Sequence, residues 1–179
     1  MAASDPSAGV RDAVAGDAAA CAALYAPYVR ETAITFELDA PGEQEMAARI
    51  AASRAGHAWV VLEQGGAVCG YAYGAQWQSR PAYRFSCEVS VYVEMGRRRS
   101  GAGRALYEGL FERLRARGFR NAIAGMTVPN EASEGLHLAL GFRPVGTYTN
   151  VGYKLGAWHH VAYFQLQLAE TVAMPPEPR

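Results

Sequence analysis

The alternation of hydrophobic and polar positions along the chain predicts a protein built from both helices and strands. Apolar residues recur at helical spacing in four segments, and helices are therefore expected at residues 17–28, 43–54, 100–117 and 131–140. Alternating or continuous apolar runs predict strands at residues 57–63, 68–77, 85–94, 121–128, 142–149 and 158–168. The strands first follow one another as hairpins and then alternate with helices. This order predicts a mixed α/β sheet with helices on both faces.

Individual residues mark the ends of these elements. Asp17 is expected to be the N-cap of the first helix, and Gly118 is expected to end the third. The tripeptide Gln64-Gly65-Gly66 lies between two apolar runs and predicts a hairpin turn.

Composition and charge narrow the class of protein. The chain has 179 residues, of which 50% are hydrophobic and 19% charged, which indicates one globular domain. We place this domain at 10–170, with flexible ends at 1–9 and 171–179. The formal net charge of zero disfavours a general nucleic-acid binder. No secretory signal or membrane span is expected, and the three cysteines show no metal spacing. We therefore expect a cytoplasmic protein without a metal.

The segment from Val91 to Leu106 carries the strongest chemical signal. A predicted strand leads into a loop rich in arginine and glycine, and this loop opens directly into a helix. Backbone N–H groups, the positive helix start and the arginines together suit a pyrophosphate. A dinucleotide-binding loop would need glycine where Leu106 stands, and a Walker loop would need Gly-Lys-Ser/Thr. The arginines between 113 and 120 are interpreted as a solvated helix face.

Glu88 lies near the start of the strand that leads to this loop. On strand periodicity it shares one face with Ser90 and Tyr92. A carboxylate in a central strand is costly to desolvate, so Glu88 is a candidate base for removing a proton from a substrate ammonium. The alternative is a salt-bridged carboxylate at the end of a strand.

The loop and two further segments resemble a known family, the GNAT acetyltransferases. Arg98-Arg99-Ser100-Gly101-Ala102-Gly103 resembles their acyl-CoA motif, Arg/Gln-x-x-Gly-x-Gly/Ala. The segment 130–142 resembles their second signature, Asn-x-x-Ser-x-x-x-Tyr-x-x-x-Gly-Phe, with His137 at the Tyr position. Further marks resemble the phosphinothricin acetyltransferase-like branch: Trp77, Arg80, Ala82, Tyr83, Glu88, Pro129, Asn130, His137, Gly156, Trp158 and His159.

This resemblance implies a splayed central sheet of about seven strands, a homodimer, and acetyl-CoA as co-substrate. It implies Glu88 as the catalytic base and His137 as a candidate acid, with a packed helix histidine as the alternative. Arg80 and Tyr83 would contact the substrate, and a solvated loop arginine remains the alternative for Arg80. The cofactor-binding residues that it implies are Val91, Tyr92, Val93, Arg98, Arg99, Ser100, Gly101, Ala102, Gly103, Arg104, Asn130 and Ser133.

The chain departs from this branch at two positions, with Gln78 in place of a lysine and Val89 in place of a small hydroxyl residue. The predicted function is acetylation of the primary amine of a small amino acid or analogue, of the phosphinothricin or methionine sulfoximine type. Two alternatives stay open: acetylation of a protein N-terminus or lysine, and a non-catalytic acyl-CoA sensor. No membrane or nucleic-acid partner is expected.

Overall fold

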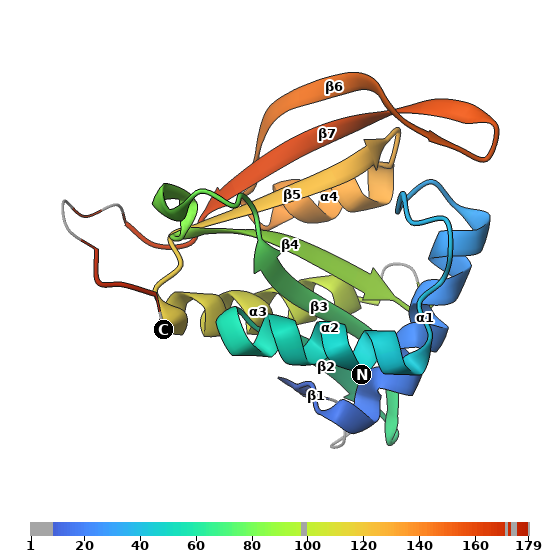
Figure 1. Ribbon diagram of the computed structural model, residues 1–179, viewed down its shortest axis with the longest axis horizontal. Coiled ribbons are helices and arrows are strands. Elements are labelled where there is room, and N and C mark those ends of the chain that lie inside the picture. Colours follow the sequence, from blue (N-terminus) through green and yellow to red (C-terminus); the bar gives the residue numbers. More distant parts are fainter. Residues whose placement is uncertain (1–8, 98–99, 171, 173–174, 179) are drawn as a thin grey trace, which may run out of the picture.

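The computed structural model describes residues 9–97, 100–170, 172 and 175–178. Within these residues, one sheet has the strand order β1-β2-β3-β4-β5-β7-β6 (Figure 1). Its strands are β1 Gly9–Asp12, β2 Trp59–Gln64, β3 Ala67–Gln76, β4 Ser86–Val93, β5 Asn121–Val128, β6 Arg143–Lys154 and β7 Ala157–Gln167. The helices are α1 Ala18–Glu31, α2 Glu43–Gly56, α3 Ala102–Arg117 and α4 Glu131–Ala139, with 3-10 turns η1 Ala15–Asp17 and η2 Pro81–Tyr83.

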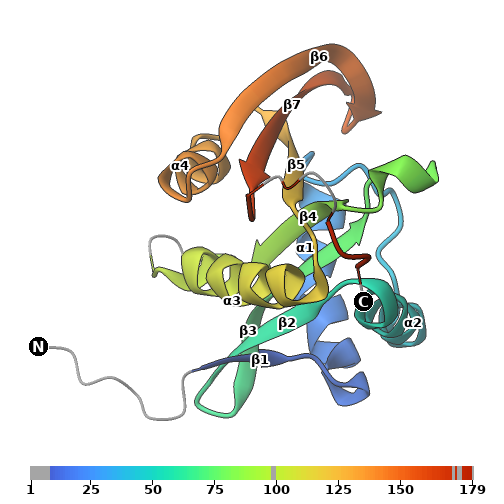
Figure 2. The same cartoon turned by 90° about the vertical axis from the view of Figure 1, so that its left-hand side faces the viewer.

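The helices lie on both faces of the sheet, as the sequence predicts. Figure 2 shows α1 and α2 on one side of the strands and α3 and α4 on the other. The alternation along β4 separates two apolar cores. Val89, Val91 and Val93 belong to the core beneath α3, whereas Tyr92 packs with the core beneath α1 and α2. The predicted mixed α/β fold is therefore confirmed.

Most predicted elements are present with small shifts of their ends, but β1 was missed. Its four residues are too few to show an alternation, and they become a strand only by pairing with β2. The strand β6 extends to Lys154, five residues beyond its predicted end at Thr149. Its pairing with β7 shifts register between Tyr148 and Gly152. This irregularity interrupts the alternation of residues along the strand, so the sequence pattern does not show that the strand continues.

The predicted role of Asp17 as the N-cap of α1 is wrong. Its side chain makes no cap hydrogen bond to that helix. Instead, its carboxylate accepts hydrogen bonds from the Val14 N–H at 2.8 Å and from both terminal nitrogens of Arg11 at 2.8 Å. The Arg11 guanidinium holds the pKa of the Asp17 carboxyl below its ordinary value. A charged partner from β1 therefore replaces the expected helix contact.

The hairpin turn between β2 and β3 is confirmed. Gly65 and Gly66 form a two-residue connection with φ of 58° and 78°, the left-handed region that this turn type needs at both positions. Among the described residues, none of the helices combines the length and the apolar character needed to cross a membrane.

Candidate active site

The site is built around a split in the sheet between β4 and β5. These parallel strands pair only at Ser86↔Asn121, Cys87↔Ala122 and Glu88↔Ile123. Beyond Glu88, β4 continues along β3 while β5 continues along β7. The two halves of the sheet therefore separate beyond Glu88, as Figure 1 shows.

The split exposes the backbone edge of β4 to a ligand. The Glu94 N–H donates to the Cys69 carbonyl at 2.9 Å, so the residues two and four positions earlier also direct their backbone groups toward β3. The backbone groups of Val91 and Val93 therefore face the split, while those of Tyr92 face β3. The ring of Tyr92 packs against Tyr25 at 4.8 Å. Of these three predicted cofactor contacts, the geometry suits Val91 and Val93 but turns Tyr92 away.

The N-terminus of α3 lies beyond the end of β4. Gly101 precedes the helix with φ of 80°, a conformation that glycine adopts without a steric penalty. The Ser100 hydroxyl donates to the Arg97 carbonyl at 3.0 Å and accepts from the Ala102 N–H at 3.3 Å. These contacts hold Ser100 at the start of α3, the end of the helix that would face a pyrophosphate. Arg98 and Arg99 lie outside the described residues.

Close packing and hydrogen bonds fix the first turn of α3 against α4. A Cβ atom at Gly103 would lie 2.9 Å from the Leu136 side chain, so glycine allows this close approach. The Arg104 guanidinium donates to the Ala139 carbonyl at 2.9 Å and to the Glu108 carboxylate at 3.1 Å. Arg104 therefore ties the two helices together and presents its charge beside the turn.

Asn130 and Ser133 define the start of α4. The Asn130 side-chain oxygen accepts a hydrogen bond from the Ser133 N–H at 3.2 Å and caps the helix. Its side-chain NH₂ is the group that could meet a bound ligand. The Ser133 hydroxyl lies 3.4 Å from Nδ1 of His137. The predicted contacts of Asn130 and Ser133 with a cofactor stay predictions.

Glu88 lies at the apex of the split. Its side chain is partly buried, and burial raises the pKa of its carboxyl above the ordinary value. Its charge contributes to the raised pKa values of the Tyr73 and Tyr163 phenols, so it is electrostatically close to both rings. Among the described residues, no cationic side chain forms a salt bridge with it. This environment favours the predicted base over the salt-bridged alternative.

His137 is buried beneath the site with both ring nitrogens engaged. Nδ1 lies 2.7 Å from the Ser133 carbonyl, which can only accept, so Nδ1 carries the proton. Nε2 then accepts from the Tyr107 hydroxyl at 3.1 Å. Burial lowers the pKa of the imidazole. The neutral ring thus has no N–H directed at the split, an arrangement that favours the packed-histidine alternative; the acid role stays a prediction.

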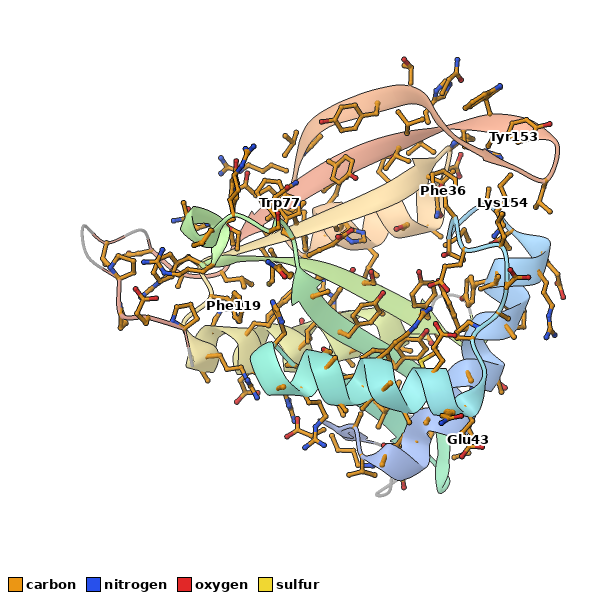
Figure 3. The ribbon with its side chains drawn as sticks, viewed as in Figure 1. Phe36, Glu43, Trp77, Phe119, Tyr153 and Lys154 are labelled. Carbon is orange, nitrogen blue, oxygen red and sulfur yellow. The ribbon has the colours of Figure 1, made fainter. Side chains whose placement is uncertain are left out.

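The loop between β3 and β4 forms the other candidate substrate surface. Tyr83 packs edge-on against Trp77, with centroids 5.1 Å apart; Figure 3 labels Trp77 on this loop. Arg84 donates to both carboxylate oxygens of Glu177 at 2.6 and 2.7 Å, which leaves Arg80 as the arginine to contact an anion. A cavity of about 280 Å³ beside the loop is lined by Gly56, His57, Gln76, Gln78, Arg80, Pro81, Tyr83, Arg84, Ser86, Phe119, Glu177 and Pro178.

Sequence reasoning missed several polar residues around the split. The Tyr28 hydroxyl donates to the Val93 carbonyl at 2.6 Å, and Tyr107 holds His137. Lys154 is buried with 4% of its surface exposed. Of these residues, only Lys154 could have been singled out from the sequence, because it is the single lysine among the 17 Lys and Arg residues of the chain.

Comparisons with known proteins identify the class. Residues 10–162 match the family described as acetyltransferase (GNAT) domain. The chain is 34% identical over 169 residues to the phosphinothricin N-acetyltransferase of Streptomyces viridochromogenes, covering 94% of this chain and 91% of the relative. The chain therefore belongs to the GNAT acetyltransferase family, and the prediction of an N-acetyltransferase is confirmed.

Two solved structures extend this similarity. The GNAT superfamily phosphinothricin acetyltransferase of Sinorhizobium meliloti, in complex with acetyl-CoA, has a TM-score of 0.89 and 37% identity, covering 97% of this chain and 94% of its own. The ribosomal-protein-alanine N-acetyltransferase of Brucella melitensis has a TM-score of 0.85 and 32% identity, covering 88% and 98%.

Proposed function

We propose that this enzyme transfers the acetyl group of acetyl-CoA to the primary amine of a small amino acid or amino-acid analogue. The observation that carries the proposal is a partly buried carboxylate, Glu88, at the apex of a split whose edge offers the backbone groups of Val91 and Val93. The similarity to phosphinothricin N-acetyltransferases supports the same reaction class.

The co-substrate fits the geometry of the split. The pyrophosphate would meet the N-terminus of α3, where the glycine turn and Arg104 lie. The pantetheine arm would run along the β4 edge and bind the backbone groups of Val91, since the Val93 carbonyl already accepts from Tyr28. The acetyl carbonyl would then accept a hydrogen bond from the Val93 N–H, which stabilises negative charge as it develops on the oxygen.

The chemistry follows from two reactants held side by side. Glu88 takes a proton from the substrate ammonium, and the free amine attacks the thioester carbon. The C–S bond breaks as the C–N bond is completed, and the second proton of the attacking nitrogen passes to the leaving thiolate, through water or His137. Proximity supplies roughly 7–11 kcal/mol of the barrier, and the base a further hundred- to ten-thousand-fold in rate. No covalent enzyme intermediate is required.

The proposed substrate class rests on the relatives and on Arg80. One relative is the L-methionine sulfoximine/L-methionine sulfone acetyltransferase of Pseudomonas aeruginosa PAO1, 35% identical over 171 residues. The planar guanidinium of Arg80 suits a carboxylate or phosphinate oxygen. Gln78 carries no charge, so we expect less preference for phosphinothricin itself than in relatives with lysine at this position.

A panel of amines tests the proposal. Release of the CoA thiol is measured with phosphinothricin, methionine sulfoximine, methionine sulfone, ordinary amino acids and short peptides. Turnover of one or more small amino acids or analogues supports it. Preference for a peptide with N-terminal alanine would favour the alternative function, which the similarity to the Brucella enzyme raises. Binding of acetyl-CoA without turnover of any amine would indicate a sensor.

We also infer that the enzyme is a homodimer. The hairpin of β6 and β7 carries apolar side chains that are each more than half exposed: Val145, Tyr148, Val151, Tyr153, Leu155 and Trp158. Large apolar side chains left exposed along one hairpin suit a protein interface. Light scattering after gel filtration should give twice the chain mass of 19.2 kDa, and Trp158→Glu should reduce it to the monomer value. A monomeric native protein would refute this inference.

A cytoplasmic location remains part of the proposal. The three cysteines are free and buried, as is usual for proteins of a reducing compartment.

A further inference from the structure

The segment Thr32–Glu37, between α1 and α2, bridges the two halves of the split sheet. On the half that contains β4, Tyr25 of α1 contacts it through the Thr35 hydroxyl at 2.6 Å and the Glu37 carboxylate at 2.9 Å. Arg49 of α2 donates to both Glu37 oxygens at 2.6 and 2.8 Å. One end of the bridge is thus fixed by α1 and α2.

Three contacts fasten the same segment to the other half. The Thr127 hydroxyl of β5 donates to the Ala33 carbonyl at 2.6 Å. The Lys154 ammonium of β6 donates to the Thr35 carbonyl at 2.7 Å. The Phe36 ring lies against Gly152, where a Cβ atom would come within 2.1 Å of it. Figure 3 shows Phe36 and Lys154 together at this junction.

Lys154 is an unusual choice for such a contact. It is 4% exposed, although removing an ammonium from water is costly unless it is paired or hydrogen-bonded. Burial lowers its pKa, while the nearby Glu37 carboxylate opposes that shift. A charged donor makes a stronger hydrogen bond than a neutral one, so the Thr35 carbonyl is held more firmly than a hydroxyl could hold it.

The position of the bridge connects it with the amine. Glu88, Ser90 and Tyr92 present their side chains on the α1 and α2 face of β4, so an amine that reaches Glu88 approaches from that face. The bridge crosses the split on the same face, between α1 and the ends of β5 and β6 (Figure 1). It is therefore placed to wall the amine pocket without touching the turn at α3.

We propose that Lys154 is a positioning residue, which holds the Thr32–Glu37 bridge across the split and thereby sets the affinity for the amine substrate. This inference rests on the proposed function. Beyond Glu88 the two halves share no strand pairing, so the bridge limits how far they separate. Loss of the anchor would loosen the amine pocket and leave the acetyl-CoA seat intact.

A kinetic comparison tests the role. Lys154→Met keeps most of the side-chain volume but removes the donor, and Thr127→Val removes the second anchor with little change of shape. Lys154→Met should raise the KM for the amine about ten- to a hundredfold, the range expected when a hydrogen bond from a charged group is lost. Thr127→Val should raise it about two- to tenfold, because the hydrogen bond that it removes is neutral. The KM for acetyl-CoA should change less than about twofold. Arg143→Met, which removes a charge from an exposed position of the same strand, is the matched control.

Two measurements that do not depend on turnover keep the test decisive. Lys154 carries the only side-chain ammonium of the chain, so an amine-reactive acetyl ester followed by mass spectrometry should leave Lys154 unmodified in the native protein. Lys154 should react readily in urea, where the chain is unfolded. Hydrogen exchange of residues 32–41 should become faster in Lys154→Met than in Arg143→Met.

The outcomes separate this inference from the proposed function. If Lys154 reacts as fast in the native protein as in urea, or if folded Lys154→Met and Thr127→Val keep the amine KM of the native enzyme, the positioning role is overturned. If Lys154→Met does not fold, Thr127→Val decides. If the native enzyme acetylates no amine, the proposed function fails, while modification and exchange still decide whether Lys154 anchors the bridge.

Discussion

Replacement of Glu88 by glutamine tests the centre of the mechanism. The change keeps the size of the side chain and removes its ability to accept a proton. Turnover should fall about a hundred- to ten-thousand-fold, the usual contribution of a general base, which corresponds to roughly 3–5 kcal/mol of transition-state stabilisation. The Kd for acetyl-CoA should stay nearly unchanged, because the proposed acetyl-CoA site, at the start of α3 and along the backbone edge of β4, does not involve this carboxylate.

The pH dependence of the reaction should also report the ionisation of Glu88. Burial raises the pKa of Glu88 above its ordinary value of 4.5, and only the ionised form can act as the base. The value of kcat/KM should therefore fall as the pH is lowered through this raised pKa. The residual activity of Glu88→Gln should lack this acid limb.

Stability distinguishes loss of chemistry from loss of structure. A carboxyl whose pKa is raised on folding contributes its stability below the unfolded-state pKa, and that contribution is lost as the pH rises through the folded-state pKa. Above the folded-state pKa the native protein holds a partly buried charge that the glutamine variant lacks. Glu88→Gln should therefore be at least as stable at pH 7, and the difference should vanish below about pH 4.

The turnover number is measured by release of the CoA thiol at saturating amine, and the stability by thermal unfolding of the same samples. Glu112→Gln is the matched control, since Glu112 is exposed on α3, and it should keep full activity. Full turnover by Glu88→Gln at neutral pH would remove Glu88 from the role of base. A large loss of stability in that variant would contradict the environment described for Glu88.

The remaining predictions concern the turn at α3, the ion pair near α1 and the buried histidine. Gly101→Ala should lower the free energy of unfolding in denaturant by about 1–2 kcal/mol, because its φ of 80° strains any residue with a Cβ atom. Gly135→Ala, in open space on α4, is the control and should be neutral or stabilising. An equal loss at both sites would refute the left-handed conformation of Gly101. Asp17→Asn should destabilise by roughly 1–3 kcal/mol at pH 7, because it weakens a charge-assisted contact with Arg11. The pKa of Asp17 is lowered on folding, so this stabilisation is present above the unfolded-state pKa and lost as the pH falls through the folded-state value. A difference in stability between the two proteins that does not shrink as the pH falls would contradict it. His137→Gln should lower the Tm clearly but kcat less than about tenfold if the ring only packs, whereas a fall of a hundredfold or more would assign it the acid role.

The elements and the glycine turn before α3 could be predicted because their signals are local. The glycine pair at Gly65 and Gly66 specifies its own turn, and the alternation along β4 already separates Glu88 from the valines. Asp17 shows the limit of local reasoning. Its side chain has the right chemistry for an N-cap, but Arg11 from β1 competes for it, and β1 itself exists only through pairing with β2.

The sequence by itself determined the periodicity of the strands and helices, the glycine turn before α3 and the kinds of reactive groups available. Tertiary structure alone decided that β4 leaves β5 after Glu88, that Tyr107 engages His137, and that Lys154 reaches Thr35 across 119 positions of the chain. Periods of 2 and 3.6 residues report what a residue does within its own element. Burial, pKa and partnership depend on segments that the folded chain brings together from far apart, and no local pattern records them.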